Sequence, residues 1–212
     1  MNVKWIVFEA GDGAGKSTQI KMLEDYYYNE RNISPFVCRQ PGNTKLGDAI
    51  RSIVLSDKYS NDMCSEAERF LFAADNAQFI EEIIIPNMTL NTDNIIIQDR
   101  YTPYSNFAYG VYGNGVSKDF MKLLEIATRG YYPDIVFLLD LDPVLAQERI
   151  VNRLEAITRI DKLGLDFHKR VRDGYLDLAE SNPEKFRIID ASKNQEIVHQ
   201  NIIDELLKFE DL

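Results

Sequence analysis

The residues with the clearest chemical potential form a glycine-rich stretch near the N-terminus of this 212-residue chain. After a short apolar run, and directly before a helical pattern, the chain reads Gly11-Asp12-Gly13-Ala14-Gly15-Lys16-Ser17-Thr18. Glycines let successive backbone N–H groups surround a polyphosphate, a lysine reaches the outer phosphates, and a hydroxyl binds Mg²⁺. We therefore predict that nucleotide phosphates bind at Gly11, Gly13, Ala14, Gly15, Lys16, Ser17 and Thr18. The full pattern has glycine at position 10, and Ala10 fits there only if its backbone φ is negative.

Two arginines form a second set of candidates, because each of them follows a predicted strand. Arg39 comes after the second apolar run and Arg100 after the third. The carboxyl ends of parallel strands border the ligand crevice, so both side chains should face the same space as the glycine-rich loop. Two guanidinium forks suit a phosphomonoester. The alternative for either arginine taken alone is an ion pair on the surface.

The elements that must position these residues follow from an alternation of short apolar runs and longer amphipathic stretches, which is typical of strand–helix units in a parallel sheet. The predicted strands are Trp5–Phe8, Phe36–Cys38, Ile95–Ile97, Ile135–Leu139 and Phe186–Ile189. The predicted helices are Lys16–Tyr28, Leu46–Leu55, Ser65–Ile85, Lys118–Thr128, Pro143–Asn152, Asp166–Ser181 and Ile197–Phe209, and Pro86 is expected to end the longest one. We predict a three-layer α/β fold with a five-stranded parallel sheet. Because no linker divides the chain, we expect one domain over residues 1–212, with an irregular segment at about 153–164 as a small lid.

The charge balance limits the class of partner. The chain has 24 Lys and Arg residues against 34 Asp and Glu residues, which gives a net charge of −10. A binder of nucleic acid polymers or of anionic membranes needs a concentrated basic surface, so we expect neither. Cys38 and Cys64 are too few for a disulfide framework and are not spaced as a zinc site. With no membrane-span pattern or signal-peptide pattern, these features favour a cytoplasmic protein.

The glycine-rich loop alone does not distinguish a kinase from a GTPase or a motor ATPase. A GTPase should carry an Asn-Lys-x-Asp guanine reader after a later strand, and this chain has none with that spacing. A motor should close a strand with an acidic pair, whereas the third strand here ends in Asp99 followed by Arg100. The arginine indicates a second anion instead.

Five ordered motifs resemble the thymidylate kinase family of P-loop nucleoside monophosphate kinases, and the resemblance covers nearly the whole chain. They are Phe8-Glu9-Ala10-Gly11-Asp12-Gly13-Ala14-Gly15-Lys16-Ser17-Thr18, Arg39-Gln40-Pro41-Gly42, Leu71-Phe72-Ala73-Ala74, Asp99-Arg100-Tyr101 with Ala108-Tyr109, and Pro133-Asp134 running to Leu139-Asp140. The resemblance implies the fold of the P-loop NTPases, ATP as phosphoryl donor, Mg²⁺ as cofactor, phosphorylation of dTMP to dTDP, and a homodimer.

The resemblance also implies roles for individual residues. Lys16 and Ser17 would serve ATP and Mg²⁺, with Asp99 helping to position the metal, and Arg39 and Arg100 would hold the monophosphate. Asp12 would lie near the sugar 3′-hydroxyl, Tyr109 would crowd the 2′ position, and Phe72 would stack on the base. A catalytic arginine would come from the lid region, with Arg153 as the first candidate, Arg159 as the second, and Arg149 on the preceding helix.

Three positions depart from the family pattern. Gln40 replaces a glutamate, Asn76 replaces an arginine that reads thymine, and Gly110 stands where a glutamine or asparagine is frequent, with one extra residue before it. Asn76 both donates and accepts, so it would read a pyrimidine at shorter reach or admit another base. Two alternatives to a dTMP kinase therefore stay open: a kinase of the same family with another base preference, and a nucleotide-binding regulator without catalysis.

Overall fold

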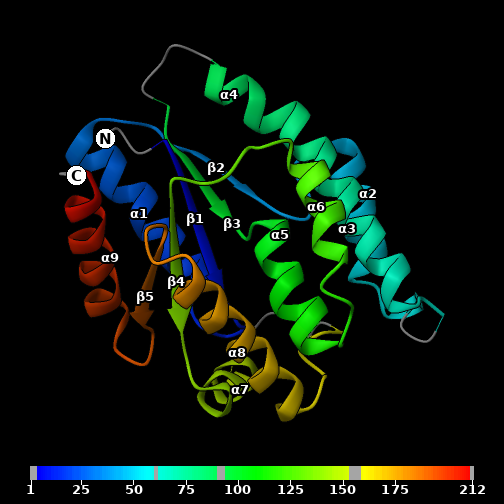
Figure 1. Cartoon of the computed structure of the whole chain (residues 1–212). Coiled ribbons are helices and arrows are strands. Elements are labelled where there is room, and N and C mark those ends of the chain that lie inside the picture. The colour runs from blue at the N-terminus through cyan, green and yellow to red at the C-terminus, as the bar shows by residue number, and fades with distance from the viewer. Residues whose placement is uncertain (1–3, 60–61, 90–93, 153–158, 211–212) are drawn as a thin grey trace.

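A sheet of five parallel strands forms the centre of the molecule in the computed structural model, which describes residues 4–59, 62–89, 94–152 and 159–210. The strands are β1 (Trp5–Ala10), β2 (Phe36–Arg39), β3 (Ile96–Asp99), β4 (Ile135–Asp140) and β5 (Phe186–Asp190). Their order is β2-β3-β1-β4-β5. The strands are short and nearly continuous apolar runs because helices cover both faces of the sheet. The predicted three-layer α/β fold is confirmed (Figure 1).

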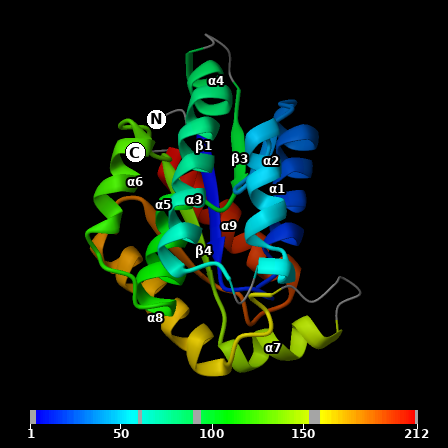
Figure 2. The same ribbon diagram turned by 90° about the vertical axis from the view of Figure 1, so that its right-hand side faces the viewer.

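Helices connect the strands and cover the sheet. They are α1 (Lys16–Arg31), α2 (Lys45–Val54), α3 (Ser65–Phe79), α4 (Ile85–Thr89), α5 (Thr102–Ser105), α6 (Phe120–Thr128), α7 (Pro143–Asn152), α8 (Leu165–Ser181) and α9 (Gln195–Glu210). A 3₁₀ turn, η1, covers Asp57–Tyr59, and two π-helical segments cover Ile80–Ile84 (η2) and Asn106–Gly113 (η3). Figure 2 shows α2, α3 and α6 side by side on one side of the molecule. Among the described residues, no helix is long and apolar enough to cross a membrane.

The two faces of the sheet bury separate apolar clusters, and alternate residues of each strand belong to different clusters. Ile6 and Phe8 of β1 pack with α1 and α9 on one face. Trp5 and Val7 pack with α3, α5 and α8 on the other face. This alternation is the period of two that a strand imposes on its side chains. It fixes the register of β1, the strand that leads into the glycine-rich loop.

The position of β1 determines where ligands can bind. β1 pairs with β3 on one side and with β4 on the other, so the chain reverses its direction of travel across the sheet at β1. In open α/β sheets such a switch point forms the ligand crevice at the carboxyl ends of the strands. The register places Asp99 beside Phe8 on one side and beside Arg39 on the other. The loop after β1 and the ends of β2 and β3 therefore share one edge.

The helix that follows Ser65 is longer than the sequence indicates. The prediction that Pro86 ends it is wrong, because the helical path continues through the π turn η2 and then α4 to Thr89. Proline in an α-helix clashes with the carbonyl four residues earlier. A π turn bonds each N–H five residues back and shifts those carbonyls, and Pro86 then occupies the first turn of α4, where a missing N–H is tolerated.

A helical segment between β3 and α6 was not expected from the sequence. α5 leads into η3, and η3 carries Tyr109 and Gly110. A π-helix holds one residue more per turn than the α-helix it interrupts, and such segments are frequent at functional sites.

Candidate functional site

The glycine-rich loop leaves the end of β1 and enters α1 with two left-handed glycines. Gly13 has a φ of 83° and Gly15 a φ of 87°, a region that is readily available only to glycine. Gly15 is the N-cap of α1, so the free N–H groups of the first helical turn point into the loop. Ala10 lies in β1 with an ordinary strand backbone. Its methyl group is therefore compatible with the loop, as the pattern required.

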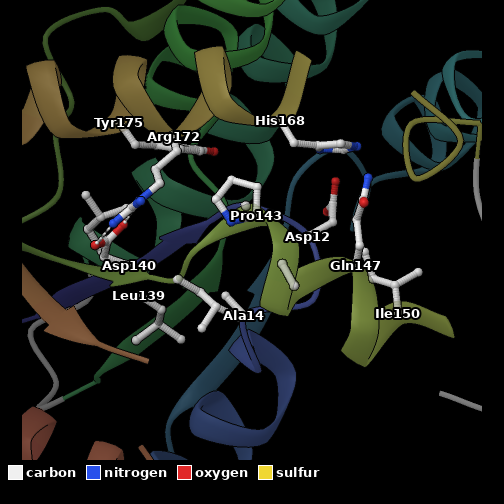
Figure 3. A pocket seen from close by; sticks show the side chains of 14 residues that line it. Asp12, Ala14, Leu139, Asp140, Pro143, Gln147, Ile150, His168, Arg172 and Tyr175 are labelled. Carbon is white, nitrogen blue, oxygen red and sulfur yellow. Dashed lines mark hydrogen bonds and ion pairs between the residues drawn. The ribbon is translucent and has the colours of Figure 1, made fainter. Parts of the chain in front are cut away.

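Helix α7 lies directly on this loop. A Cβ atom at Gly13 would be 2.6 Å from the carbonyl oxygen of Ala146 and 3.0 Å from Cγ1 of Ile150. Between the loop, α7 and α8 lies a small cavity of about 30 Å³. Figure 3 shows Asp12, Gln147 and His168 directed toward one another at this cavity. The loop therefore packs closely against α7 at Gly13.

Lys16 and Asp99 form an ion pair at the carboxyl edge. The Nζ atom of Lys16 is 2.8 Å from Oδ1 of Asp99. Burial opposes ionisation of Asp99, but Lys16 and Arg100 outweigh it and hold the pKa of this carboxyl below its usual range. Ser17 and Asp99 line the same open hollow. A hydroxyl and an ionised carboxylate provide oxygen ligands of the kind that Mg²⁺ binds.

The described residues contain no cluster of three or more His, Cys, Asp or Glu side chains that could hold a metal ion by themselves. Magnesium usually keeps several waters and binds through one or two protein oxygens plus the phosphates of a nucleotide. The donor set of Ser17 and Asp99 therefore fits Mg²⁺ in company with a nucleotide.

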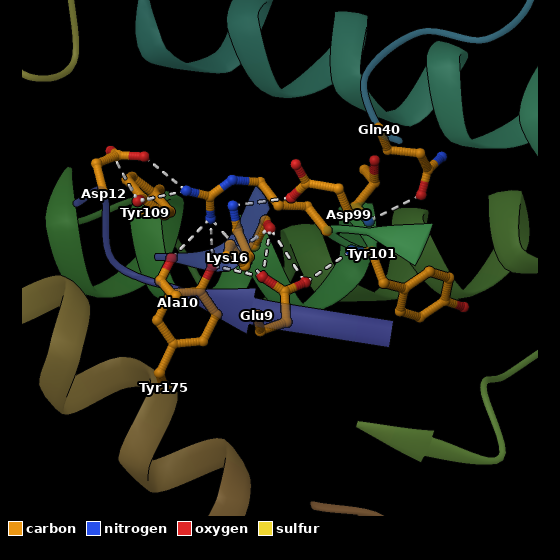
Figure 4. Close-up of polar contacts among 12 residues, drawn as sticks. Glu9, Ala10, Asp12, Lys16, Gln40, Asp99, Tyr101, Tyr109 and Tyr175 are labelled. Atoms are coloured by element: carbon orange, nitrogen blue, oxygen red, sulfur yellow. Dashed lines mark hydrogen bonds and ion pairs between the residues drawn. The ribbon is translucent and has the colours of Figure 1, made fainter. Parts of the chain in front are cut away.

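A buried carboxylate anchors the opposite wall of the site (Figure 4). Glu9 accepts hydrogen bonds from the Tyr101 N–H at 2.7 Å, from the Tyr175 hydroxyl at 2.7 Å, and from the Ser105 hydroxyl at 3.0 Å. Burial raises the pKa of Glu9, although these donors and Arg100 oppose the rise. Glu9 thereby ties β1, α5 and α8 together under the crevice.

Arg100 is held in a strained conformation by this wall. Its φ of 67° is rare for a residue other than glycine, and such strain is found mainly at functional sites. The guanidinium donates to the Ala10 carbonyl at 2.9 Å, to the Tyr175 hydroxyl at 3.0 Å and to Oδ1 of Asp12 at 2.7 Å. It also donates to the Tyr109 hydroxyl at 3.1 Å. Three predicted substrate residues, Asp12, Arg100 and Tyr109, thus meet in one network.

Asp12 is the acidic member of that network. Its Oδ2 accepts a hydrogen bond from the Tyr109 hydroxyl at 3.0 Å. Burial opposes its charge, but Arg100 and Lys16 outweigh burial and hold the pKa of this carboxyl below its ordinary value. Asp12 is therefore an ionised hydrogen-bond acceptor at the rim of the crevice.

A third arginine, Arg51 of α2, faces the crevice beside Arg39 and Arg100, and the sequence did not single it out. It donates to the Pro41 carbonyl at 3.0 Å. Burial lowers the pKa of Arg51, and the positive charges of Arg39 and Arg100 lower it further. Like charges are gathered here at a cost, which is the property of a site made for an anion. The signal that could have identified Arg51 in the sequence was its basic side chain on the predicted helix that follows the turn after Arg39.

The acceptor cavity, a hollow of about 170 Å³, lies between Arg51 and Arg100 on one side and α3 on the other, whereas Arg39 lines the neighbouring hollow of Ser17 and Asp99. The residues around it are Asp12, Gln40, Pro41, Arg51, Val54, Leu55, Glu68, Arg69, Phe72, Arg100, Thr102, Ser105, Asn106, Tyr109, Arg159 and Ile160. Four of these residues are arginines. Phe72 presents a half-buried ring to the cavity, as a stacking residue must.

Asn76 does not line the acceptor cavity. Its side chain is fully buried, with Oδ1 accepting from Nε2 of Gln40 at 3.2 Å and Nδ2 donating to the Thr128 hydroxyl at 3.4 Å. Gln40 is itself bonded to the amide of Gln98, which accepts from the Trp5 indole at 2.8 Å. Two departures from the family pattern, Gln40 and Asn76, are thus partners in one buried amide network.

Asp75, the neighbour of Asn76, fixes the turn that carries Arg39. Its Oδ1 accepts from the Gly42 N–H at 2.9 Å and its Oδ2 accepts from Nε2 of Gln40 at 3.3 Å. Burial raises the pKa of Asp75 to about 7, against which these hydrogen bonds act only in part. The ionised form of Asp75 is therefore costly in the folded protein.

The three arginines named for the lid region have different positions. Arg149 is exposed on α7, and Arg153 lies outside the described residues. Arg159 lines the acceptor cavity, where it forms an ion pair with Glu68 and donates to the Val54 carbonyl at 3.2 Å. The described part of this region therefore contacts the acceptor side of the crevice.

Comparison with known proteins gives a consistent result. The family model described as thymidylate kinase matches residues 8–202. A thymidylate kinase from Acholeplasma laidlawii is 35% identical over 96% of this chain and 98% of its own length. One from Desulfovibrio desulfuricans is 41% identical over 92% of this chain and 90% of its own length. The crystal structure of thymidylate kinase from Ehrlichia chaffeensis superposes with a TM-score of 0.74 at 28% identity, covering 96% of this chain and 98% of that one.

Proposed function

Because the chain belongs to the thymidylate kinase family, we propose that it transfers the γ-phosphoryl group of ATP to the 5′-phosphate of dTMP, giving dTDP and ADP. The observation that carries the proposal is the presence of two anion sites on one edge of the sheet. The glycine-rich loop with Lys16 forms the first, and the cluster of Arg39, Arg51 and Arg100 forms the second. A protein that only bound a nucleoside triphosphate would have no use for the second site.

On the donor side, the backbone N–H groups of the loop and of the first turn of α1 would surround the phosphates of ATP. Lys16 would exchange its bond to Asp99 for the outer phosphates, which offer it a higher negative charge. Ser17 and Asp99 would hold Mg²⁺ together with phosphate oxygens. When bound, the metal ion neutralises charge that develops on the transferred group.

On the acceptor side, the arginine cluster would bind the 5′-phosphate of the monophosphate through paired, charge-assisted hydrogen bonds. The carboxylate of Asp12 would accept a hydrogen bond from the sugar 3′-hydroxyl. The ring of Tyr109, fixed by Asp12 and Arg100, would leave no room for a 2′-hydroxyl. Phe72 would stack on the base, since its ring is accessible from the acceptor cavity.

Phosphoryl transfer between two polyanions depends on alignment and on charge, with little covalent work for the protein. Lys16 and Arg100 approach the junction of the two anion sites from opposite elements. We assign the catalytic arginine of the lid to Arg153, as the sequence suggests, with the lid itself at about 153–164. Arg153→Ala should lower kcat more than it raises KM for either substrate, and near-normal turnover would remove Arg153 from the mechanism.

Three broader assignments accompany the proposal. One domain over residues 1–212 is supported by the single sheet in which all the described strands pair. A homodimer is supported by apolar side chains exposed on α3 and α6, where Phe70 is 58% and Ile126 is 73% exposed. A cytoplasmic location is supported by Cys38 and Cys64, which are both free thiols.

A coupled assay of ADP release tests the function, with ATP, Mg²⁺ and a panel of nucleoside monophosphates as acceptors. We expect dTMP to give the highest kcat/KM. A higher value for another acceptor would support the kinase of altered base preference. Tight ATP binding without turnover of any acceptor would support the non-catalytic regulator. Arg39→Ala should raise KM for the monophosphate and spare KM for ATP. Arg129, which caps the C-terminal end of α6, provides the control, and Arg129→Ala should change neither KM.

A further inference from the structure

One cationic side chain in the acceptor cavity has no role in the assignments above. Arg69 belongs to α3 and precedes Phe72 by one turn, so both side chains lie on the same face of the helix. The guanidinium carbon of Arg69 is 4.8 Å from the centre of the Phe72 ring, within the range of a cation–π contact. Arg69 is only 3% exposed, yet it lines the cavity. A buried cation thus borders the ring on which a base would stack.

The guanidinium of Arg69 is fixed on two sides. Nη1 donates to Oδ1 of Asn106 at 2.9 Å, and Nη2 forms an ion pair with Glu68. Glu68 also pairs with Arg159, so one carboxylate positions two arginines of the same cavity. The Nε–H groups of Arg69 and Arg159 are buried and have no hydrogen-bond partner within the part of the chain that the structure describes. Buried donors without partners are costly, and an acceptor on a ligand would satisfy them.

Gly110 provides the space that Arg69 occupies. A Cβ atom at position 110 would be 3.1 Å from Cδ and 3.3 Å from Nη1 of Arg69. Any larger side chain on η3 would displace the guanidinium from its place beside Phe72. Asn76, in contrast, is withdrawn into the amide network behind α3 and cannot reach the cavity without breaking its bond to Gln40.

We propose that Arg69, in the space left by Gly110, is the residue that reads the acceptor base, by donating a hydrogen bond to a carbonyl oxygen on the base edge. This inference rests on the proposed function and adds its specificity determinant. A guanidinium has donors and no acceptors. Directed at position 4 of the base, it selects a pyrimidine with a carbonyl there, as in dTMP or dUMP, and rejects the 4-amino group of dCMP. Glu68 and Asn106 act as positioning residues.

The main test replaces Arg69 by methionine, which keeps the length and apolar stem and leaves Glu68 paired with Arg159. Two quantities are measured: KM for dTMP and the inhibition constant of 2-deoxyribose 5-phosphate, which carries the sugar and phosphate without a base. We expect KM for dTMP to rise about 10- to 100-fold, since a hydrogen bond from a charged group is lost. The inhibition constant of 2-deoxyribose 5-phosphate should change less than about twofold, because this compound has no base for Arg69 to contact. Arg69→Lys should have a KM for dTMP between that of the wild type and that of Arg69→Met.

Two further variants separate base reading from a structural role. Gly110→Ala removes no charge but crowds Arg69, so it should reduce the preference for dTMP over dCMP. Asn76→Ala should leave that preference within about twofold of wild type, even where the amide network loses stability.

The inference is overturned if Arg69→Met leaves KM for dTMP within twofold, or if it raises both constants equally, since equal loss indicates a disturbed site. It is also overturned if Asn76→Ala abolishes the preference for dTMP while Arg69→Met keeps it. These outcomes differ from failure of the proposed function, which would appear as absence of dTMP turnover in the wild-type protein.

Discussion

Arg51 offers the sharpest test of the arginine cluster, because its replacement should affect the free protein and the complex differently. In the free protein its charge is disfavoured by burial and by Arg39 and Arg100. Arg51→Met relieves that repulsion and loses one hydrogen bond to the Pro41 carbonyl, a contribution of about 1 kcal/mol. The two effects oppose each other, so Tm of the free variant should lie within about 3 °C of wild type.

The complex with the monophosphate should weaken strongly. Loss of one charge-assisted hydrogen bond to a phosphate costs about 2 kcal/mol. At about 1.4 kcal/mol per factor of ten, Kd for dTMP rises about 30-fold. A dTMP concentration of about 100 times the wild-type Kd stabilises the wild-type protein by about 2.7 kcal/mol but the variant by only about 0.9 kcal/mol. For a chain of this length the ligand-induced rise in Tm should fall from about 5–11 °C to about 2–4 °C.

Differential scanning fluorimetry with and without dTMP measures both quantities, and a second titration with Mg-ATP checks the donor site. Arg129→Met is the matched control, because Arg129 is an exposed arginine paired with Glu81 on the surface. It should keep the full shift with dTMP. An unchanged dTMP shift in Arg51→Met, or an equal loss of the ATP shift, would refute the assignment of Arg51 to a separate monophosphate site.

Other predictions concern stability, the loop and assembly. The pKa of Asp75 is raised to about 7 from an ordinary value of 3.8, so wild-type stability should fall as pH rises from about 4 to about 7, and Asp75→Asn should flatten urea midpoints across that window. Gly13→Ala should lose ATP binding and at least about 2 kcal/mol of stability. The new Cβ would clash with the Ala146 carbonyl, and an alanine is also strained at the positive φ of this position. Gly15→Ala, with the same φ strain and open space, should lose only about 1 kcal/mol. Phe70→Asp should shift the protein from dimer to monomer in sedimentation velocity, and an unchanged dimer would exclude the α3 face as the interface.

The sequence predicts most of the strands because their signal is local. Runs such as Ile135–Leu139 are continuous and apolar since both faces of the sheet are covered, and this pattern is independent of the rest of the fold. The glycine-rich loop was predictable for the same reason, because strand, loop and helix are consecutive. The continuation past Pro86 was not predictable, since it depends on a change of hydrogen-bond register in the preceding turn.

The acceptor side was only partly predictable, because its residues come from helices whose rotation is set by packing. Arg51 and Arg69 belong to helices that the periodicity indicated, but their direction depends on how α2 and α3 lie against each other and against α5. Asn76 matches a base-reading position in sequence, and yet the amide network with Gln40 turns it away from the cavity. Matching along the sequence identified position 76, whereas packing determined that its side chain contacts Gln40.

The contact between Gln40 and Asn76 constrains how these two positions can change during evolution. A protein with glutamate at position 40 and arginine at position 76 would place a charged pair where this chain has two neutral amides. Gln40→Glu alone would add a second buried carboxylate beside Asp75 without a cation to accompany it, at a cost of about 3–5 kcal/mol. The two states are therefore separated by a less stable intermediate, and the pair should be inherited together. A double-mutant cycle with Gln40→Glu and Asn76→Arg would measure the height of that barrier as the coupling between the two changes.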